Sequence, residues 1–298
     1  MNLDKFILET AECLDFISKP KQLPFINHRI KKLQNSSDRD LAEIRLAEYC
    51  KTNNKAKLIR PKTVCFSLHG IRTDGSWQAD LKRLIEENYE NIENIQLKFG
   101  FWDAFSFLFP WKNDKPLSYI ETQLNLLFQR QEIKDAIKVL VAHSYGTYVI
   151  YNVLKKRNDF KFDRIIFCGS VVNSNVDWTE FENTIIINDC GLKDKYPSIA
   201  QTFSFRYGIG GLTGMTDFRV ISRYHQVGHS GFFSESFMTQ YWLPFIADGV
   251  NIDSRLNAKT PYLLQLLSIL PGIGIYMILL LIIAGLTRFF FNMFSTSI

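Results

Sequence analysis

Between residues 63 and 246, short apolar runs alternate with segments long enough to form helices. Strands buried on both faces of a sheet read as continuous apolar runs, and intervening helices of this length are typical of βαβ units. The alternation predicts an α/β fold of the doubly covered kind, a mostly parallel sheet flanked by helices. The predicted strands are 63–68, 95–102, 136–142, 164–170, 184–189 and 218–224, and the predicted helices are 76–89, 115–131, one from about 145, one around 197–205, and 234–246.

Residues 1–60 precede this alternation and have a helical pattern of their own. Apolar side chains fall on one helical face near the start of the chain, at Leu3, Phe6, Ile7, Leu14 and Ile17. We therefore expect an N-terminal helical extension over 1–60 and an α/β domain over 61–250. The extension either packs on the main domain or serves as a docking surface for another protein, and both interpretations stay open.

The charges and cysteines limit the partners. The net charge is +5 and the Lys and Arg residues are scattered, whereas binding to a phosphate backbone needs a basic stripe, so no nucleic acid is expected. The five cysteines are odd in number and lack metal-ligand spacing, which favours reduced thiols in the cytosol and no metal site. Residues 1–16 lack a basic start and a small-residue cleavage site, so no export signal is expected.

The other end of the chain contains a long apolar run. From Pro261 to Leu286 there is no charged residue, and about 20 apolar residues are enough to cross a hydrocarbon layer of roughly 30 Å. The run predicts one transmembrane segment within 261–291, divided at Pro271, with the preceding domain in the cytoplasm. The alternative is a buried core helix of a soluble protein.

The stretch IKVLVAHSYGTYVIYNVL, residues 137–154, passes from an apolar strand to a helix through one serine. A serine hydroxyl needs a base to take its proton, so the side chain must stand clear of the backbone on a tight, strained turn. Such a turn presses the residues two before and two after the serine against neighbouring backbone, which favours small ones. Ala142 and Gly146 hold those positions around Ser144. The pattern predicts Ser144 as a nucleophile; the alternative is a plain strand-to-helix turn.

On this motif and on the order of its elements, the chain over roughly 60–247 resembles the α/β-hydrolase superfamily of serine hydrolases. In that family an early strand ends in His-Gly, and a backbone N–H just beyond it forms half of the oxyanion hole. Here the strand 63–68 is followed by His69, Gly70 and Ile71. The resemblance implies an oxyanion hole made by the N–H groups of Ile71 and Tyr145. A glycine turn before a helix is the alternative, and the two are compatible.

The family places its acid after the nucleophile and before its histidine. After the strand 184–189 the chain reads CGLKDKYP, in which Gly191, Asp194 and Pro197 fit the family's usual G-x-x-D-x-x-P turn. The resemblance therefore implies Asp194 as the acid. Asp189, at the strand end itself, stays open as the second choice, and either could simply be a loop carboxylate that caps the next helix.

The same order leaves His225 and His229 as candidates for the base. His229 lies in a glycine-flanked loop before the final helix, the location that the family uses, whereas His225 is close to the strand end. His229 is therefore the implied base, with His225 second. Val227 and Gly228 between the two histidines break the helical spacing of a metal-binding pair, and no further ligand is apparent.

The resemblance implies a role for each residue of the triad. His229 takes the proton of Ser144 as the serine attacks an acyl carbon and then protonates the leaving group, while Asp194 holds the imidazole in the required tautomer. Water then hydrolyses the acyl-enzyme, and no cofactor is required.

Residues 99–111, FGFWDAFSFLFPW, are crowded with aromatic side chains. Part of this segment is predicted strand, and the rest falls in the following loop, at the carboxyl edge where substrates bind in such sheets. Trp102 and Phe105 are therefore candidate substrate-binding residues, together with His69 and Gly70. The aromatic group suits an acyl-chain pocket or a rim that dips into lipid, and ordinary core packing is the alternative.

Together these features predict a membrane-anchored serine hydrolase that cleaves an ester of a lipid or another acyl compound. The ester is preferred to an amide only because the apolar tail and the aromatic segment indicate lipid. Two alternatives stay open: a catalytically silent domain of this fold used for binding or signalling, and an oligomer that disrupts membranes with the hydrolase domain as its sensor.

Overall fold

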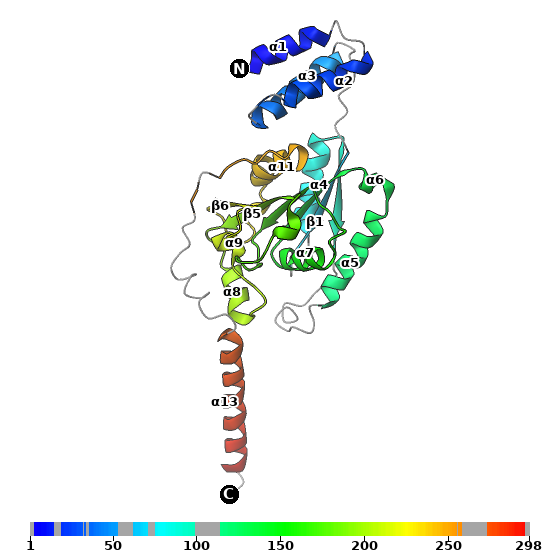
Figure 1. Cartoon of the computed structure of the whole chain (residues 1–298). Coiled ribbons are helices and arrows are strands. Elements are labelled where there is room, and N and C mark those ends of the chain that lie inside the picture. The colour runs from blue at the N-terminus through cyan, green and yellow to red at the C-terminus, as the bar shows by residue number, and fades with distance from the viewer. Residues whose placement is uncertain are drawn as a thin grey trace.

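A computed structural model of the chain contains six strands in one sheet, in the order β2-β1-β3-β4-β5-β6, and every neighbouring pair is parallel. The prediction of a parallel α/β sheet flanked by helices is confirmed (Figure 1). The strands are β1 (Thr63–Leu68), β2 (Ile92–Leu97), β3 (Ile137–His143), β4 (Arg164–Cys168), β5 (Ile185–Gly191) and β6 (Val220–His225). The structure describes residues 3–14, 19–31, 33, 36–52, 62–70, 75–98, 114–254, 256–257 and 273–295.

Alternate side chains of the central strands enter two separate hydrophobic cores, because successive strand residues point to opposite faces. Val64, Phe66 and Leu68 of β1 join the core beneath α5 (Asp114–Phe128) and α7 (Tyr145–Lys156). Cys65 between them joins the core beneath α4 (Ser76–Asn88) and α11 (Leu243–Asp248). Both faces of the sheet are therefore covered, which explains why its central strands are apolar throughout (Figure 1).

Several shorter elements complete the α/β domain. The last helix predicted from the sequence, 234–246, is divided into α10 (Glu235–Phe237), a π-helical turn and α11. The remaining elements are α6 (Gln131–Lys134), the 3₁₀ turn η4 (Thr179–Phe181), α8 (Tyr196–Phe203), α9 (Gly210–Thr213), the 3₁₀ turn η5 (Gly231–Phe233), α10 (Glu235–Phe237) and the π-helix η6 (Met238–Trp242).

Strand β2 begins three residues before the predicted strand at 95 and ends at Leu97. It lies at one edge of the sheet, so its side chains meet solvent on part of their length and Glu93 is exposed there. The prediction placed the start of the strand at Ile95, where the apolar run begins. It missed residues 92–94 because an edge strand tolerates polar side chains. The rest of the predicted strand, from residue 99, lies outside the described residues.

The N-terminal helices are α1 (Leu3–Cys13), α2 (Lys19–Lys31) and α3 (Ser36–Thr52). They share a hydrophobic core of their own, which includes Phe6, Leu14, Ile26 and Leu46. The helices lie at the end of the sheet where β1 begins (Figure 1).

The C-terminal helix α13 covers Ile273–Ser295 and contacts α8 (Figure 1). In the part of the chain that the structure describes, no helix combines the length and the apolarity that crossing a bilayer demands. The predicted transmembrane segment over 261–291 is therefore not supported, and its first residues lie outside the described ranges.

Candidate active site

The chain changes direction across the sheet at β1, because β2 lies on one side of β1 and β3 on the other. Ligands of open parallel sheets bind at the carboxyl ends of the strands beside such a switch point. Leu68 and Ala142 are paired in register at these ends of β1 and β3. The loop with His69 and Gly70 and the turn at Ser144 therefore begin side by side.

Ser144 forms the turn between β3 and α7 and has φ 53° and ψ −127°. It is the one non-glycine residue with a positive φ in the described ranges. Such a conformation costs of order 1–3 kcal/mol and persists where surrounding contacts fix it. Here the backbone N–H of Ser144 donates to the carbonyl of Cys168 at 3.0 Å, and the hydroxyl of Thr147 donates to the carbonyl of Ser144 at 2.6 Å.

Close backbone contacts explain the small residues around this turn. A Cβ atom at Gly146 would lie 2.6 Å from the carbonyl oxygen of His69, so no larger residue fits without moving that loop. A Cβ at Gly70 would lie 2.7 Å from the Cβ of Ser144. Gly70 therefore borders the serine side chain, and Ala142 is fully buried beneath it in β3.

His229 lies beside Ser144 although 85 residues separate them in the chain. The distance between His229 Nε2 and Ser144 Oγ is 2.9 Å, and His229 Nδ1 lies 2.7 Å from Asp194 Oδ2. A carboxylate only accepts, so Nδ1 carries the proton and Nε2 is left to accept the serine O–H. The side chain of His229 is 14% exposed and that of Asp194 is fully buried.

Asp194 is fixed by the turn that follows β5. Its second oxygen, Oδ1, accepts the backbone N–H of Tyr196 at 2.9 Å, and its own N–H donates to the carbonyl of Gly191. The following helix α8 has Pro197 in its first turn. The backbone N–H of Lys193 also donates to the carbonyl of Val227, which joins this turn to the loop that carries His229.

Two residues beside the His229–Asp194 pair were missed by the sequence analysis. Gly169 follows β4 with φ 54°, and a Cβ there would lie 3.1 Å from both Asp194 Oδ2 and His229 Nδ1. The ring of Tyr196 stacks on that of His229 with centroids 4.5 Å apart. A glycine directly after a buried strand was the available signal for Gly169, whereas nothing in the sequence links Tyr196 to His229.

The structure describes only part of the predicted oxyanion and substrate-binding set. Tyr145 is the first residue of α7, so its N–H belongs to the helix N-terminus beside Ser144. His69 follows β1, and its Nδ1 lies 2.6 Å from the carbonyl oxygen of Gly70. Ile71, Trp102 and Phe105 lie outside the described residues.

The second choices, Asp189 and His225, are hydrogen-bonded to each other. Asp189 accepts hydrogen bonds from His225 Nε2 at 2.8 Å and from Trp242 Nε1 at 2.9 Å, and forms a bidentate pair with Arg223 at 2.7 and 2.8 Å. Asp189 is fully buried and the other three side chains are nearly so. This cluster ties β5 to β6 and to the π-helix.

The charge of Asp189 is stabilised by this cluster. Burial alone would raise the pKa of the carboxyl group, but the positive charge of Arg223 and the hydrogen bonds from His225 and Arg223 lower it to about 2. As for metals, the residues that the structure describes contain no group of three or more His, Cys, Asp or Glu side chains that could hold an ion.

No protein-family model matches the sequence, and no curated protein matches it. Among solved structures, esterase PE8 is 14% identical, over 60% of this chain and 89% of its own, with a TM-score of 0.42. A carboxylesterase from Mesorhizobium loti is 12% identical, over 56% and 81%, with a TM-score of 0.37. An uncharacterized protein from Bacillus cereus ATCC 10987 is 14% identical, over 83% and 86%, with a TM-score of 0.43. Since all three scores are below 0.5, these likenesses carry no argument, and the α/β assignment stands on the parallel sheet itself.

Replacing Asp189 with Asn should destabilise the fold by about 3–5 kcal/mol, because it leaves the buried Arg223 charge without its partner. Since the folded pKa of Asp189 lies below the usual 3.8, its contribution is present above about pH 4 and is lost as the pH falls towards 2. In urea unfolding, the difference in the free energy of unfolding between the native chain and Asp189→Asn should therefore become smaller as the pH falls from about 4 towards 2.

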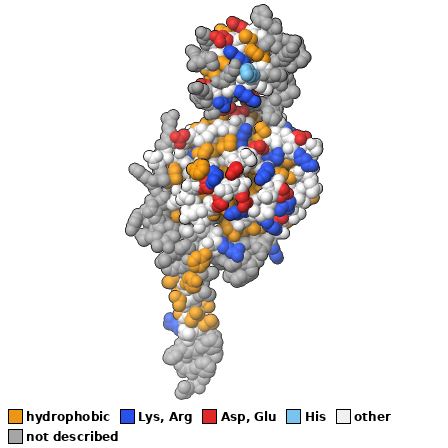
Figure 2. Space-filling view, viewed as in Figure 1, with side chains coloured by type: hydrophobic (Ala, Val, Ile, Leu, Met, Phe, Trp, Pro, Cys, Tyr) orange, Lys and Arg blue, Asp and Glu red, His pale blue; other side chains and the backbone are white. Residues whose placement is uncertain are grey.

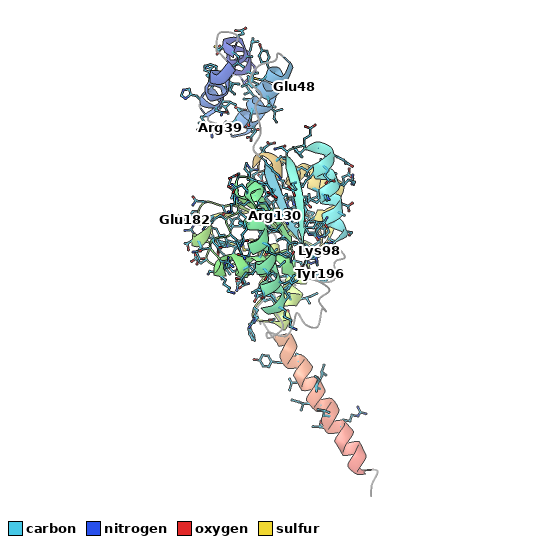
Figure 3. The ribbon with its side chains drawn as sticks, turned by 90° about the vertical axis from the view of Figure 1, so that its right-hand side faces the viewer. Arg39, Glu48, Lys98, Arg130, Glu182 and Tyr196 are labelled. Atoms are coloured by element: carbon cyan, nitrogen blue, oxygen red, sulfur yellow. The ribbon has the colours of Figure 1, made fainter. Side chains whose placement is uncertain are left out.

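The matched control is Glu182→Gln, which neutralises an exposed carboxylate labelled in Figure 3. This substitution should leave the free energy of unfolding unchanged within about 0.5 kcal/mol. Equal stability of Asp189→Asn and the native chain at pH 7 would contradict the structural role of the cluster.

Proposed function

We propose that this chain is a serine hydrolase that cleaves an ester of an acyl substrate through an acyl-enzyme. The observation that carries the proposal is the unbroken chain of hydrogen bonds from Ser144 through His229 to Asp194, with distances of 2.9 and 2.7 Å. A nucleophile, a base within reach of its proton and a group that orients the base are what this chemistry needs.

The reaction follows from the donors and acceptors along this chain. His229 Nε2 takes the proton as Ser144 Oγ bonds to the acyl carbon, and the imidazolium then gives that proton to the departing alkoxide oxygen. Asp194 stabilises the transient positive charge on His229 through Nδ1–H. In the second half a water molecule attacks the acyl carbon, His229 takes its proton, and the C–O bond to Ser144 breaks as the proton returns to Oγ.

The negative charge that develops on the substrate oxygen needs donors near Ser144. The N–H of Tyr145 at the N-terminus of α7 supports one half of such a site, since the positive end of the helix dipole favours an anion there. The second donor in this proposal is the N–H of Ile71. Removing one such donor typically costs 10²–10³ in kcat.

The choice of an ester over an amide rests on the sequence. The aromatic segment 99–111 and the apolar run from Pro261 suit an acyl chain and a lipid environment. The geometry of Ser144, His229 and Asp194 serves both reactions, so the test includes both kinds of substrate.

A fluorophosphonate probe, which reacts with activated serines, should label the native chain but not Ser144→Ala. The rate of labelling should fall strongly in His229→Ala. It should fall about 10⁴-fold in Asp194→Asn, because the asparagine imposes the wrong tautomer on the imidazole of His229. Intact-mass spectrometry over time measures the rate, and hydrolysis of p-nitrophenyl butyrate and of its anilide separates ester from amide cleavage.

Ser118→Ala, which removes an exposed serine from α5, is the matched control and should label like the native chain. Native-like labelling of Ser144→Ala would end the assignment. Slow labelling of a folded Asp189→Asn together with normal labelling of Asp194→Asn would show that the acid is misassigned. A folded native chain that neither labels nor hydrolyses either substrate would favour the binding or signalling alternative.

We further propose that α13 docks on a lipid surface, with membrane lipid as partner. Seven of its large apolar side chains are 52–69% exposed, among them the consecutive Leu280 to Ile283. Consecutive helix residues point in directions about 100° apart, so apolar side chains surround the helix, and Figure 2 shows this apolar surface. Tyr196, labelled in Figure 3, is the first residue of α8, the helix that α13 contacts. Since the ring of Tyr196 stacks on His229, the site around Ser144 lies on the side of the domain where α13 is attached.

The lipid proposal predicts that the chain floats with phosphatidylcholine vesicles in a density gradient. Leu281→Glu with Ile283→Glu should reduce flotation at least tenfold, because two charges are then forced towards lipid. Leu126→Glu is the matched control: Leu126 is 61% exposed but lies on α5. Equal flotation of all three proteins would contradict the proposal, and dye leakage that persists in Ser144→Ala would favour the membrane-disrupting alternative.

A further inference from the structure

His143 is a fully buried polar residue that the proposed reaction does not use. It is the last residue of β3 and precedes Ser144 directly. A buried imidazole costs free energy unless it is hydrogen-bonded, so its presence in the centre of the sheet calls for a physical reason.

The ring of His143 is hydrogen-bonded to the backbone of the proposed base. Its Nε2 lies 3.0 Å from the carbonyl oxygen of His229. Because a carbonyl only accepts, Nε2 carries the proton of a neutral ring and Nδ1 is left as an acceptor. Consistent with this, Nδ1 has no hydrogen-bond partner among the described residues. One hydrogen bond therefore joins the residue before the nucleophile to the main chain of the base.

The same ring also packs against the imidazole of His229. The centroids of the two imidazole rings are 4.4 Å apart. The ring of His143 also makes a T-shaped contact with the ring of Phe233, with centroids 4.7 Å apart. Phe233 is itself stacked on Trp77 of α4 with centroids 5.0 Å apart. His143 thus contacts both the backbone and the ring of His229 from a rigid strand.

This arrangement requires that His143 stay neutral. When His229 takes the serine proton it becomes a cation, and a second cation 4.4 Å away would oppose that step. Burial, the neighbouring His229 and, to a smaller extent, His69 lower the pKa of His143 well below 6.5. His143 is therefore uncharged at the pH at which a histidine base works.

We propose that His143 is a positioning residue that holds His229 at hydrogen-bonding distance from Ser144, through its Nε2–H bond to the His229 carbonyl and through ring contact. The inference deepens the proposed function and rests on it for its effect on catalysis. The contacts between His143 and His229 do not depend on whether the chain is a hydrolase.

The test uses His143→Phe, which keeps an aromatic ring but lacks the donor, and His143→Gln, which restores an N–H group. For p-nitrophenyl butyrate, His143→Phe should lower kcat about tenfold and leave KM within about twofold, since one hydrogen bond that fixes the base is lost. His143→Gln should recover most of kcat. His28→Phe, at an exposed site on α2, is the matched control and should not change kcat.

Nitrogen-15 NMR of the histidines gives a readout that does not depend on hydrolysis. In the native chain His143 should be the neutral Nε2–H tautomer at pH 7, and the Nδ1–H proton of His229 should exchange slowly. In His143→Phe that exchange should quicken at least tenfold. This assay on the native chain also keeps the inference falsifiable if His143→Phe does not fold.

The outcomes separate the two proposals. A folded His143→Phe with native kcat and native exchange at His229, or a native His143 found as the Nδ1–H tautomer or charged at pH 7, overturns the positioning role. A native chain that hydrolyses nothing overturns the proposed function, and the exchange of the His229 proton then decides the positioning role by itself.

Discussion

The positive φ of Ser144 is the constraint that the candidate site depends on. It turns the chain sharply between β3 and α7, so that the hydroxyl stands clear of the backbone and faces the carboxyl edge of the sheet. The strained conformation is offset by contacts on each side: the carbonyl of Cys168, the hydroxyl of Thr147, and the close approach of Gly146 to the loop after β1. Cys168 ends the neighbouring strand β4 and the loop after β1 follows another strand, whereas Thr147 belongs to α7 itself. The turn therefore depends on contacts with two neighbouring strands as well as on its local sequence.

Two carboxylates near the end of β5 have different surroundings, and the difference follows from where each lies along the chain. Asp189 is still in the strand, where Arg223 and His225 of the paired strand β6 and Trp242 surround it and hold it charged. Asp194 lies five residues on, in a turn where the chain has left the sheet and its side chain meets the loop after β6. A charge enclosed by strong donors within a sheet stabilises the fold, whereas a carboxylate in a turn is available to orient a histidine.

The imidazole of His229 is held by more than its two hydrogen bonds. His143 contacts it from the strand, Tyr196 stacks on it from α8, and Gly169 leaves the space that the His229–Asp194 pair occupies. A base that moves by about 1 Å loses a large part of its effect, so such contacts are what preorganised sites require. They come from three elements that are far apart in the chain.

Short apolar runs in the sequence were enough to predict most of the strands, because strands that are buried on both faces of a sheet have apolar side chains throughout. The apolar pattern missed the start of β2, where an edge position tolerates the exposed Glu93.

The small residues around the turn indicated Ser144, and the resemblance implied Asp194 and His229, with Asp189 and His225 left open. Only the tertiary structure separated Asp194 from Asp189, because both follow the same strand and the difference lies in which side chains of β6 and its loop they meet. It alone revealed His143, Gly169 and Tyr196 as neighbours of His229. Such contacts join residues dozens of positions apart, and sequence spacing carries information only about neighbours along one element.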